Sequence, residues 1–340
     1  MIFETLINNV KKIFTRNQQK EALQAPANPW DKLTLGDRMK LYESFFTGKN
    51  FPGKYPNWPQ RNAIRIPGGW PSGCLNGYTE VPDGFYPVIR VDGHCFSTFT
   101  RKFEKPYDMR IINAMKDATI KLVDVFHALL GYTQSDEITI VLPKDAELFG
   151  RKCQKIATLA ASTAAVAFYD SLIKSGYSGN LPAFDARTFG VPNIDEAANC
   201  IIWRERDAIK NSISNVARKF YSDKELLSKN SDDKIKMMAD KGYDFWTQTL
   251  LSFARGMYIK RIVETRPYTP EELEKLPPKH QARLAPDSTL MCTRSKFVQM
   301  EYPLAAHIAN LPDVLFGDAE PVLKEGIANL HPFETNKETA

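Results

Sequence analysis

The sequence has few cysteines and histidines, and their spacing excludes several kinds of site. Its five cysteines stand at positions 74, 95, 153, 200 and 292, without a CxxC pair. They therefore indicate reduced thiols in a cytoplasmic protein, and neither a disulfide framework nor a zinc site. The five histidines form no HExxH motif or comparable cluster of metal ligands.

Long apolar runs and a strong charge of either sign are also missing. No run of about 18 apolar residues occurs, so we expect no transmembrane helix and no membrane partner. The formal net charge is only +5, which is compatible with an anionic partner but does not require one. The chain has 340 residues, of which 43% are hydrophobic and 25% charged. This composition is typical of a globular protein with one large or two smaller domains.

The stretch 88–142 carries the clearest structural pattern. An apolar run from Val88 ends on Asp92 and Gly93, and residues 131–142 form two β-prone runs around a Ser-Asp-Glu turn, which predicts a strand followed later by a hairpin. Between them, apolar residues recur at spacings of three and four, as one buried helix face requires. These residues are Met109, Ile112, Met115, Thr119, Leu122, Val123, Phe126 and Leu130.

If the first strand packs beside the hairpin, Asp92 and Asp136 face the same pocket. Two converging carboxylates suit Mg²⁺, which takes oxygen ligands. Two such ions about 3.5–4 Å apart can hold the attacking and leaving oxygens of a phosphoryl transfer. Gly93 would let the backbone approach a metal or a triphosphate closely. Either acid alone is better explained as a turn residue.

Several short motifs follow one another in a fixed order. They are 36–40 (GDRMK), 90–99 (RVDGHCFSTF), 105–108 (KPYD), 131–137 (GYTQSDE), 184–187 (FDAR), 191–193 (VPN), 203–207 (WRERD) and 211–215 (NSISN). Together they resemble the tRNA-histidine guanylyltransferase family, and most closely its bacterial and phage-type guanylyltransferase-like branch of 3′–5′ RNA polymerases. The resemblance spans roughly residues 34–320, with a gap near 45–85.

The resemblance implies an α+β fold with a polymerase/cyclase-type palm, a ferredoxin-like βαββαβ core, additional helices and a C-terminal α/β extension. We expect an N-terminal amphipathic helix and linker over 1–33. A palm domain over 34–221 would contain an aromatic-, Pro- and Gly-rich insertion at 45–87, and an extension over 222–340 would pack on the palm. Aromatic residues of the insertion could stack nucleic-acid bases or pack as a structured loop.

The implied activity is the addition of nucleotides, mainly G, to the 5′ end of tRNA in the 3′–5′ direction. ATP or GTP would first activate a 5′-monophosphate end, and the cofactor would be two Mg²⁺ ions. A palm-type nucleotide cyclase and a catalytically silent RNA-binding palm module remain alternatives. The expected partners are tRNA, nucleoside triphosphates and further copies of the chain in a dimer or tetramer, in the cytoplasm.

The resemblance also assigns roles to individual residues. Asp92, Asp136 and Glu137 would be catalytic, and Asp92, the Gly93 carbonyl and Asp136 would hold metal. The expected nucleotide-binding residues are His94, Cys95, Phe96, Lys105, Ser135, Arg151, Lys152 and Lys155. Asn211, Asn215 and Lys241 are candidate RNA contacts. The cations at 151–155 stand at the start of a predicted helix, whose free N–H groups attract phosphate, although a solvated basic face explains them equally well.

The sequence departs from the family pattern in three places. His94 stands where an arginine is usual, and a lone histidine there is more often structural than catalytic. Ser97 stands where the family often has a histidine, directly after the phenylalanine matched by Phe96. Residues 209–215 lack the leading histidine of the eukaryotic segment that is tied to tRNA-histidine addition. We therefore expect repair of several 5′-truncated tRNAs rather than strict tRNA-histidine specificity.

Elsewhere the pattern predicts helices over 35–46 and 195–221 and strands over 183–191 and 253–263. A long helix after residue 149 should bury Ile156, Leu159, Thr163, Val166, Ala167, Leu172 and Ile173. Residues 222–242 are polar and charged, and we expect an exposed, partly mobile excursion.

Overall fold

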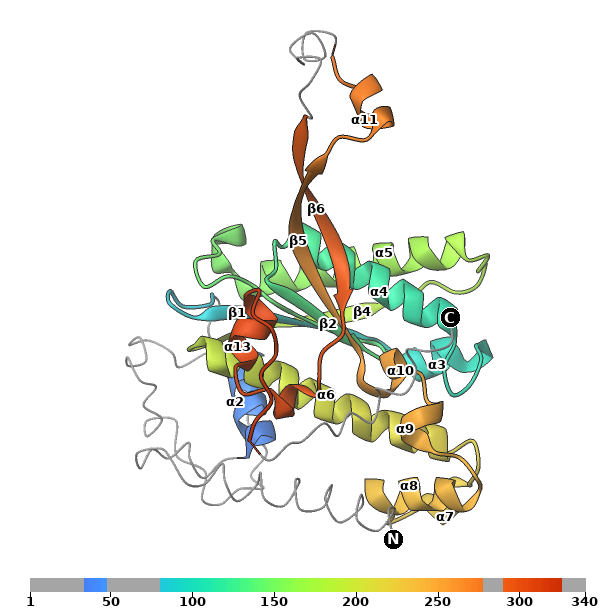
Figure 1. Ribbon diagram of the computed structural model, residues 1–340. Helices are drawn as coiled ribbons and strands as arrows, with labels where there is room; N and C mark the ends of the chain where they lie inside the picture. The colour runs from blue at the N-terminus through green and yellow to red at the C-terminus, as the bar shows by residue number, and fades with distance from the viewer. Residues whose placement is uncertain (1–33, 48–79, 278–289, 326–340) are drawn as a thin grey trace, which may run out of the picture. The chain divides into compact units, whose positions relative to one another are not determined.

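The computed structural model describes residues 34–47, 80–277 and 290–325 (Figure 1). The chain divides into two compact units, residues 1–78 and 79–340. In the described part of the first unit the predicted helix over 35–46 is present as α2 (Leu35–Thr47). The predicted N-terminal helix and most of the aromatic insertion lie outside the described residues.

The second unit contains a six-stranded antiparallel sheet with the strand order β4-β1-β3-β2-β5-β6. The strands are β1 (Tyr86–Gly93), β2 (Leu130–Gln134), β3 (Glu137–Val141), β4 (Phe184–Val191), β5 (Met257–Pro267) and β6 (Met291–Met300). The first four strands and two long helices follow one another as β1-α4-β2-β3-α5-β4, so the predicted βαββαβ order is present. Two strands from the predicted C-terminal extension, β5 and β6, continue the same sheet.

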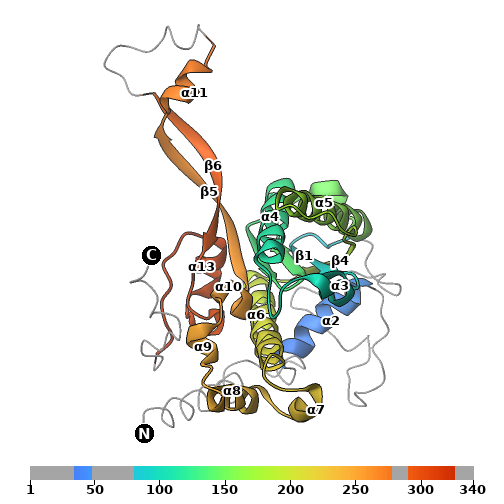
Figure 2. The same cartoon turned by 90° about the vertical axis from the view of Figure 1, so that its right-hand side faces the viewer.

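Helices cover both faces of this sheet, with α4 and α5 on one side and α6 on the other (Figures 1 and 2). The longer helices are α4 (Met109–Val125), α5 (Cys153–Lys174), α6 (Ile194–Ala217) and α8 (Ser231–Asp240). The shorter ones are α3 (Phe96–Phe99), α7 (Asp223–Leu226), α9 (Phe245–Gln248), α10 (Leu251–Arg255), α11 (Pro270–Glu274) and α13 (Leu311–Phe316). Single 3₁₀ turns span Thr100–Lys102, Leu148–Arg151 and Ala305–His307.

The main core lies between the sheet and the pair α4 and α5. Ile89, Val91, Ile138 and Ile140 alternate along β1 and β3 and are fully buried there, because successive strand residues point to opposite faces. The opposite face, beneath α6, carries Arg90, Asp92, Glu137 and Thr139 instead. The sheet therefore has one apolar face and one face with a buried layer of charge.

The local predictions hold for the hairpin and differ from the structure at one helix end and over part of one helix face. β2 and β3 flank the Ser135-Asp136 turn as predicted. The helix α4 ends at Val125, and Leu130 begins β2. The buried face of α5 is Ile156, Ala160, Ala164, Phe168 and Leu172, because small alanines allow close approach to the sheet, while Val166 and Ile173 are exposed.

By length and composition alone, one helix in the described part of the chain, α5, is apolar enough to cross a membrane. Its alanine-rich sequence interrupts apolar residues with Ser, Thr and Tyr, so a search for continuous apolar runs does not find it. The stripe from Ile156 to Leu172 packs in the main core, while Val166 and Ile173 on the same helix are exposed.

Two further predictions differ from the structure in part. Residues 222–242 are largely exposed, as predicted, but α7 and α8 also carry Leu226 and Met238 into a second apolar cluster with Val216 and Phe245. The predicted strand over 253–263 begins later, since α10 occupies its first residues and Gly256, at φ 83°, ends that helix before β5.

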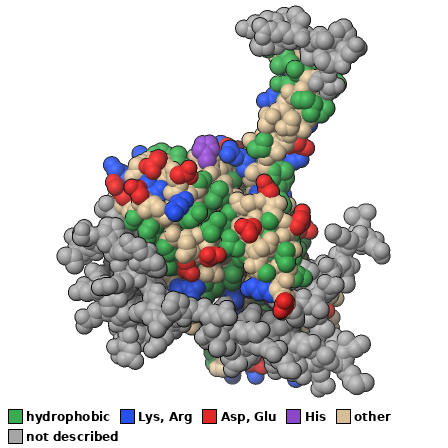
Figure 3. Space-filling model, turned by 60° about the vertical axis from the view of Figure 1, so that its left-hand side comes forward, with side chains coloured by type: hydrophobic (Ala, Val, Ile, Leu, Met, Phe, Trp, Pro, Cys, Tyr) green, Lys and Arg blue, Asp and Glu red, His purple; other side chains and the backbone are tan. Residues whose placement is uncertain are grey.

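β5 and β6 continue beyond the sheet as a two-stranded ribbon that carries α11 near its tip (Figures 1 and 2). β2 pairs with β5 only over residues 257–259, whereas β5 and β6 pair over their whole length. On the face shown in Figure 3, acidic and basic side chains are interspersed along the ribbon and the body. One such pair on the ribbon is Lys296 with Glu264, at 3.0 Å.

Candidate active site

The two predicted metal-binding acids lie close together, at the end of β1 and in the turn between β2 and β3. β1 ends at Asp92 and Gly93, and the β2–β3 turn places Asp136 beside them, where the Gly93 N–H donates to the Asp136 carbonyl at 2.9 Å. Ser135 takes the left-handed conformation, φ 50°, to make this tight turn. A residue other than glycine is strained there, so the fold holds Asp136 in place at a conformational cost.

The two carboxylates interact with each other. Burial raises the pKa of Asp136 above its ordinary value, and the charge of Asp92 raises it further. Burial also raises the pKa of Asp92, against the attraction of Arg90, while Asp185 adds repulsion. Both acids are half-buried. The site therefore concentrates negative charge that a divalent cation would neutralise.

Glu137 lies beside Asp92 on the same face of the sheet, but its carboxylate is already paired. Arg204 of α6 approaches one oxygen to 2.6 Å, and Arg90 lies 3.9 Å from the other. The Arg204 contact is an ion pair without an aligned hydrogen bond. Burial raises the pKa of Glu137 to about 7, although both arginines act to lower it.

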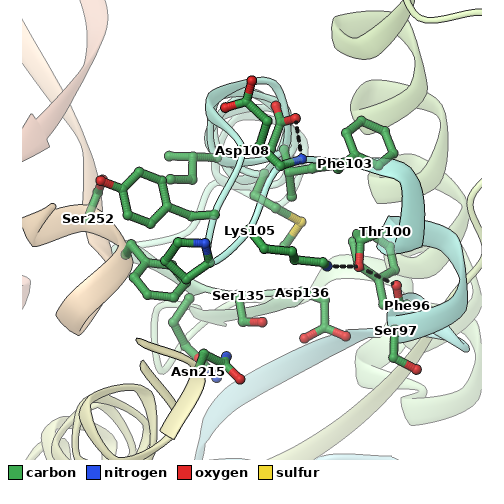
Figure 4. Close-up of a pocket in the computed structure, with 18 of the residues that line it drawn as sticks. Phe96, Ser97, Thr100, Phe103, Lys105, Asp108, Ser135, Asp136, Asn215 and Ser252 are labelled. Carbon is green, nitrogen blue, oxygen red and sulfur yellow. Dashed lines mark hydrogen bonds between the residues drawn. The ribbon is translucent and has the colours of Figure 1, made fainter. Parts of the chain in front are cut away.

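A pocket of about 540 Å³ opens beside Asp136 (Figure 4). Its wall is largely aromatic and aliphatic, with Phe96, Phe103, Tyr107, Ile111, Ile112, Met115, Phe253 and Met257. Polar groups lie around this wall, and Figure 4 shows the Lys105 ammonium above Asp136, Ser135 next to Asp136, and Asn215 on the far side of Ser135. The Lys105 ammonium is 3.4 Å from the Thr100 hydroxyl. Such a lining suits a ligand with a flat apolar part and an anionic part.

Asp108 fixes the loop that forms one side of the pocket. Its carboxylate accepts hydrogen bonds from the backbone N–H groups of Glu104 and Arg110, and the Arg110 guanidinium binds it at 3.0 and 2.7 Å. These bonds lower the pKa of Asp108 to about 2, with the Arg110 side chain as the largest cause. The carboxylate is thus both the N-cap of α4 and the anchor of the segment that presents Lys105.

The structure brings together five of the predicted site residues in this pocket: Phe96, Lys105, Ser135, Asp136 and Asn215. His94 and Cys95 are exposed at the end of β1, with their side chains 3.4 Å apart. Phe96 is buried against Phe99, Phe168 and Phe184. Its ring therefore supports the pocket from beneath.

Arg151 does not have the predicted nucleotide-binding arrangement. Its guanidinium is buried, and its N–H groups donate to five backbone carbonyls, those of Val81, Pro82, Phe85, Lys144 and Ala146, at 2.8–3.1 Å. A guanidinium has five N–H donors, so none is left for a phosphate. Arg151 instead ties the segment before β1 to the connection before α5.

The remaining predicted contacts lie apart from the pocket lining. Lys152 and Lys155 are exposed at the start of α5, where a phosphate could meet them. Asn211 donates to Asp207 at 3.2 Å. The Lys241 ammonium lies 5.7 Å from the ring of Tyr221.

Sequence reasoning missed two cations of the pocket. Arg218 and Lys219 line its rim next to Asn215, and the Arg218 guanidinium donates to the Asn215 carboxamide oxygen at 3.0 Å. They follow Asn215 by three and four positions, the spacing that puts side chains on one helix face. That spacing could have revealed them.

The acid pair fits Mg²⁺ by three observations. Its donors are carboxylate oxygens, the ligands that this ion prefers. A Cβ at Gly93 would meet Phe96 at 2.3 Å and the Asp136 Cβ at 2.9 Å, so the backbone approaches the acids as closely as only glycine permits. Mutual repulsion of Asp92 and Asp136 would be relieved by a cation. Within the described residues, no group of three or more His, Cys, Asp or Glu side chains forms a metal cluster, so water and phosphate oxygens would complete the coordination.

An antiparallel α+β sheet with two such carboxylates beside a mixed apolar and basic pocket defines a class of protein suited to metal-dependent chemistry on phosphates. A family model described as tRNAHis guanylyltransferase matches residues 76–192. A solved bacterial tRNA(His) guanylyltransferase-like protein in complex with ATP is 32% identical, with a TM-score of 0.50 over 67% of this chain and 88% of that one. The chain belongs to the tRNA(His) guanylyltransferase family.

Two curated relatives show how far the similarity extends. An uncharacterized protein of Acanthamoeba polyphaga mimivirus is 31% identical over 204 residues, which are 52% of this chain and 70% of that protein. The tRNA(His) guanylyltransferase of Candida glabrata is 32% identical over 142 residues. That match covers 39% of this chain and 60% of the Candida protein, less than two thirds of its length.

Proposed function

We propose that this chain is a nucleotidyltransferase that adds nucleotides, mainly G, to the 5′ end of tRNA in the 3′–5′ direction on a palm-type sheet. The observation that carries the proposal is the pair formed by Asp92 and Asp136, of which Asp136 lines a pocket with aromatic walls and basic residues. Family membership and the ATP complex of the similar bacterial protein support a nucleotide in that pocket.

Two displacements make up the proposed reaction. First, an oxygen of the tRNA 5′-monophosphate attacks the α-phosphate of ATP or GTP, and pyrophosphate leaves. Second, the 3′-hydroxyl of an incoming nucleoside triphosphate attacks the activated 5′-phosphate, and the nucleoside monophosphate leaves. The 3′-hydroxyl proton passes to solvent or to a nearby carboxylate. Each step moves negative charge between phosphate oxygens, so fixed positive charge is the main requirement of the site.

Residues of the described chain meet this requirement from two sides. Asp92 and Asp136, with the Gly93 carbonyl, would hold two Mg²⁺ ions, which when bound supply charge neutralisation and orient the phosphates. Lys105 approaches from the 104–108 loop, and Arg218 and Lys219 approach from the end of α6. The apolar wall would take the base, and exclusion of water there strengthens each electrostatic contact.

The test is transfer of radiolabelled GTP to 5′-monophosphorylated, 5′-truncated tRNA. We expect product with Mg²⁺, none with a chelator, and none from Asp92→Asn or Asp136→Asn. Asp124→Asn is the matched control, because Asp124 is half-exposed near the opposite end of α4 and pairs with Lys121 at 3.8 Å. Normal transfer by either site variant would contradict the metal assignment. Cyclic nucleotide, or no product with any RNA, would contradict the proposed activity.

The choice of tRNA can be tested in the same assay. Since residues 209–215 lack the histidine of the eukaryotic segment, we propose that base pairing with the opposite strand selects the added nucleotide. Truncated tRNA-Phe and tRNA-His should then both be extended when the complementary triphosphate is supplied. Strong preference for tRNA-His, or addition of G whatever the opposing base, would instead show a dedicated histidine-tRNA enzyme.

A further inference from the structure

Glu137 stands next to Asp136 in sequence, yet its surroundings differ from those of a metal ligand. Its side chain is 9% exposed and lies between two guanidinium groups, with Arg204 at 2.6 Å and Arg90 at 3.9 Å. A carboxylate in that position has its charge neutralised by protein. The ion pair joins β3 to α6, directly behind the strand ends that carry Asp92 and Asp136, which we call the acid edge.

Arg204 is held on three sides. Besides Glu137, its guanidinium contacts the Asp207 carboxylate at 2.5 Å, and its central carbon lies 4.2 Å from the centroid of the Trp203 ring. The same ring lies 5.6 Å from the Arg90 guanidinium. A planar guanidinium that is stacked, paired twice and only 7% exposed has one available orientation.

The helix that carries Arg204 also carries part of the pocket. Asn215 lies in the last turn of α6, Arg218 directly follows that helix, and both line the pocket that Asp136 also lines. A second attachment of α6 faces another strand, because Glu205 binds Arg255 and the Tyr258 hydroxyl on the β5 side. The Arg204–Glu137 pair is therefore the attachment that joins α6 to the acid edge itself.

We propose that Arg204 is a positioning residue for the transfer reaction: through its ion pair with Glu137 it fixes α6, and hence Asn215 and Arg218, relative to the strand ends that carry Asp92 and Asp136. Glu137 is then the anchor of that helix and not a metal ligand. This inference rests on the proposed function only for its kinetic readout, since nucleotide and metal binding can be measured separately.

The experiment compares Glu137→Gln, Arg204→Gln and the double variant in the full-length chain. If both residues act as one unit, each single variant lowers kcat/KM by about tenfold or more, and the double variant stays within about threefold of the worse single variant. Binding of Mn²⁺ in the presence of GTP, followed by electron paramagnetic resonance, should stay within about threefold of wild type in all three. Arg204→Lys keeps the charge and should recover part of the lost kcat/KM.

Glu205→Gln is the matched control, because it removes a buried carboxylate from the next position of α6 that pairs with Arg255 at 2.5 Å. In a Glu205→Gln and Glu137→Gln double variant, the loss of kcat/KM should equal the product of the two single losses. Loss of Mn²⁺ binding by about tenfold in Glu137→Gln alone would make Glu137 a ligand and overturn the proposal. The proposal is also overturned if the loss of kcat/KM in the double variant equals the product of the losses in Glu137→Gln and Arg204→Gln.

Urea unfolding shows whether each variant is folded under assay conditions. If the glutamine variants are not folded, the same double-mutant comparison is made with Glu137→Asp and Arg204→Lys. If wild type transfers nothing to RNA, the proposed function fails. The positioning pair is then judged on GTP affinity, which both single variants should weaken without further loss in the double variant.

Discussion

Substitution of Gly93 by alanine tests whether the close approach of β1 to the acid turn matters for activity. The added Cβ would lie 2.3 Å from a Phe96 ring carbon and 2.9 Å from the Asp136 Cβ. The Phe96 ring cannot swing aside, because Phe99 and Phe168 pack on it at 5.1 and 5.4 Å between ring centroids. The backbone at position 93 must therefore shift by roughly 1 Å to restore ordinary van der Waals contact with Phe96, and the Asp136 turn, whose carbonyl accepts from the N–H of residue 93, should shift with it.

Two losses should follow. Overpacking of this kind costs about 1–3 kcal/mol of unfolding free energy, which urea unfolding measures. Displacement of a metal-binding carboxylate by roughly 1 Å should also lower kcat/KM for nucleotide transfer by about 100-fold. The assay is radiolabelled GTP transfer at a temperature where wild type and variant are both folded.

Gly131→Ala separates the two effects. A Cβ there would meet Val123 at 2.6 Å and Thr119 at 2.7 Å, in the core beneath α4 and on the face of the sheet away from α6. Its cost in stability should be similar, about 1–3 kcal/mol, with kcat/KM within a few-fold of wild type. Equal kinetic losses in both variants would refute a specific role for Gly93, as would a destabilised Gly93→Ala with normal kinetics.

Four further outcomes are expected. Since burial and Asp92 raise the pKa of Asp136, ionisation of this carboxyl opposes folding. Asp136→Asn should therefore raise the melting temperature of the metal-free protein at pH 7 but not below pH 3.8. Differential scanning fluorimetry measures this change. Asp108→Ala should lower the free energy of unfolding by about 1–2 kcal/mol at neutral pH. Because the pKa of Asp108 is lowered to about 2, this difference between wild type and variant should disappear as pH falls from about 4 to about 2. A difference that stays constant with pH would contradict the ion pair. Arg151→Ala should cost about 3 kcal/mol or more by leaving buried carbonyls without donors, against less than about 0.5 kcal/mol for exposed Lys152→Ala. Finally, Lys152→Ala and Lys155→Ala should impair RNA with a 5′-monophosphate more than RNA with a 5′-triphosphate, which needs no activation; equal losses would indicate a general phosphate contact.

The sequence predicts the part of the fold that depends on local periodicity. Apolar residues at alternate positions, or three and four apart, identify β1, α4 and the hairpin because each pattern buries one face of one element. The same logic places Asp92 and Asp136 together, since a strand and its neighbouring hairpin end at one edge. Even so, the pattern predicted the buried face of α5 only in part: Ile156 and Leu172 are buried, but buried Ala160 and Ala164 were not predicted, because alanine carries little hydrophobic signal although it allows the closest packing.

Contacts between distant segments could not be predicted in this way. Arg151 is committed to carbonyls such as that of Val81, 70 positions earlier, through a turn in which Phe149, Gly150 and Arg151 all have left-handed φ angles near 55°. No local pattern marks that turn. Likewise no local pattern predicts that Arg204, from a different layer of the fold, lies against Glu137.

The number of residues between Arg204 and Asn215 in α6 limits which insertions and deletions this protein can tolerate. Asn215 follows Arg204 by 11 positions, which is close to three helical turns and about 16.5 Å. An inserted or deleted residue in between would turn the pocket end by roughly 100° relative to the anchored end. Residues 205–214 thus act as a fixed spacer whose number of residues is constrained, even at solvated positions where the type of side chain is free to change.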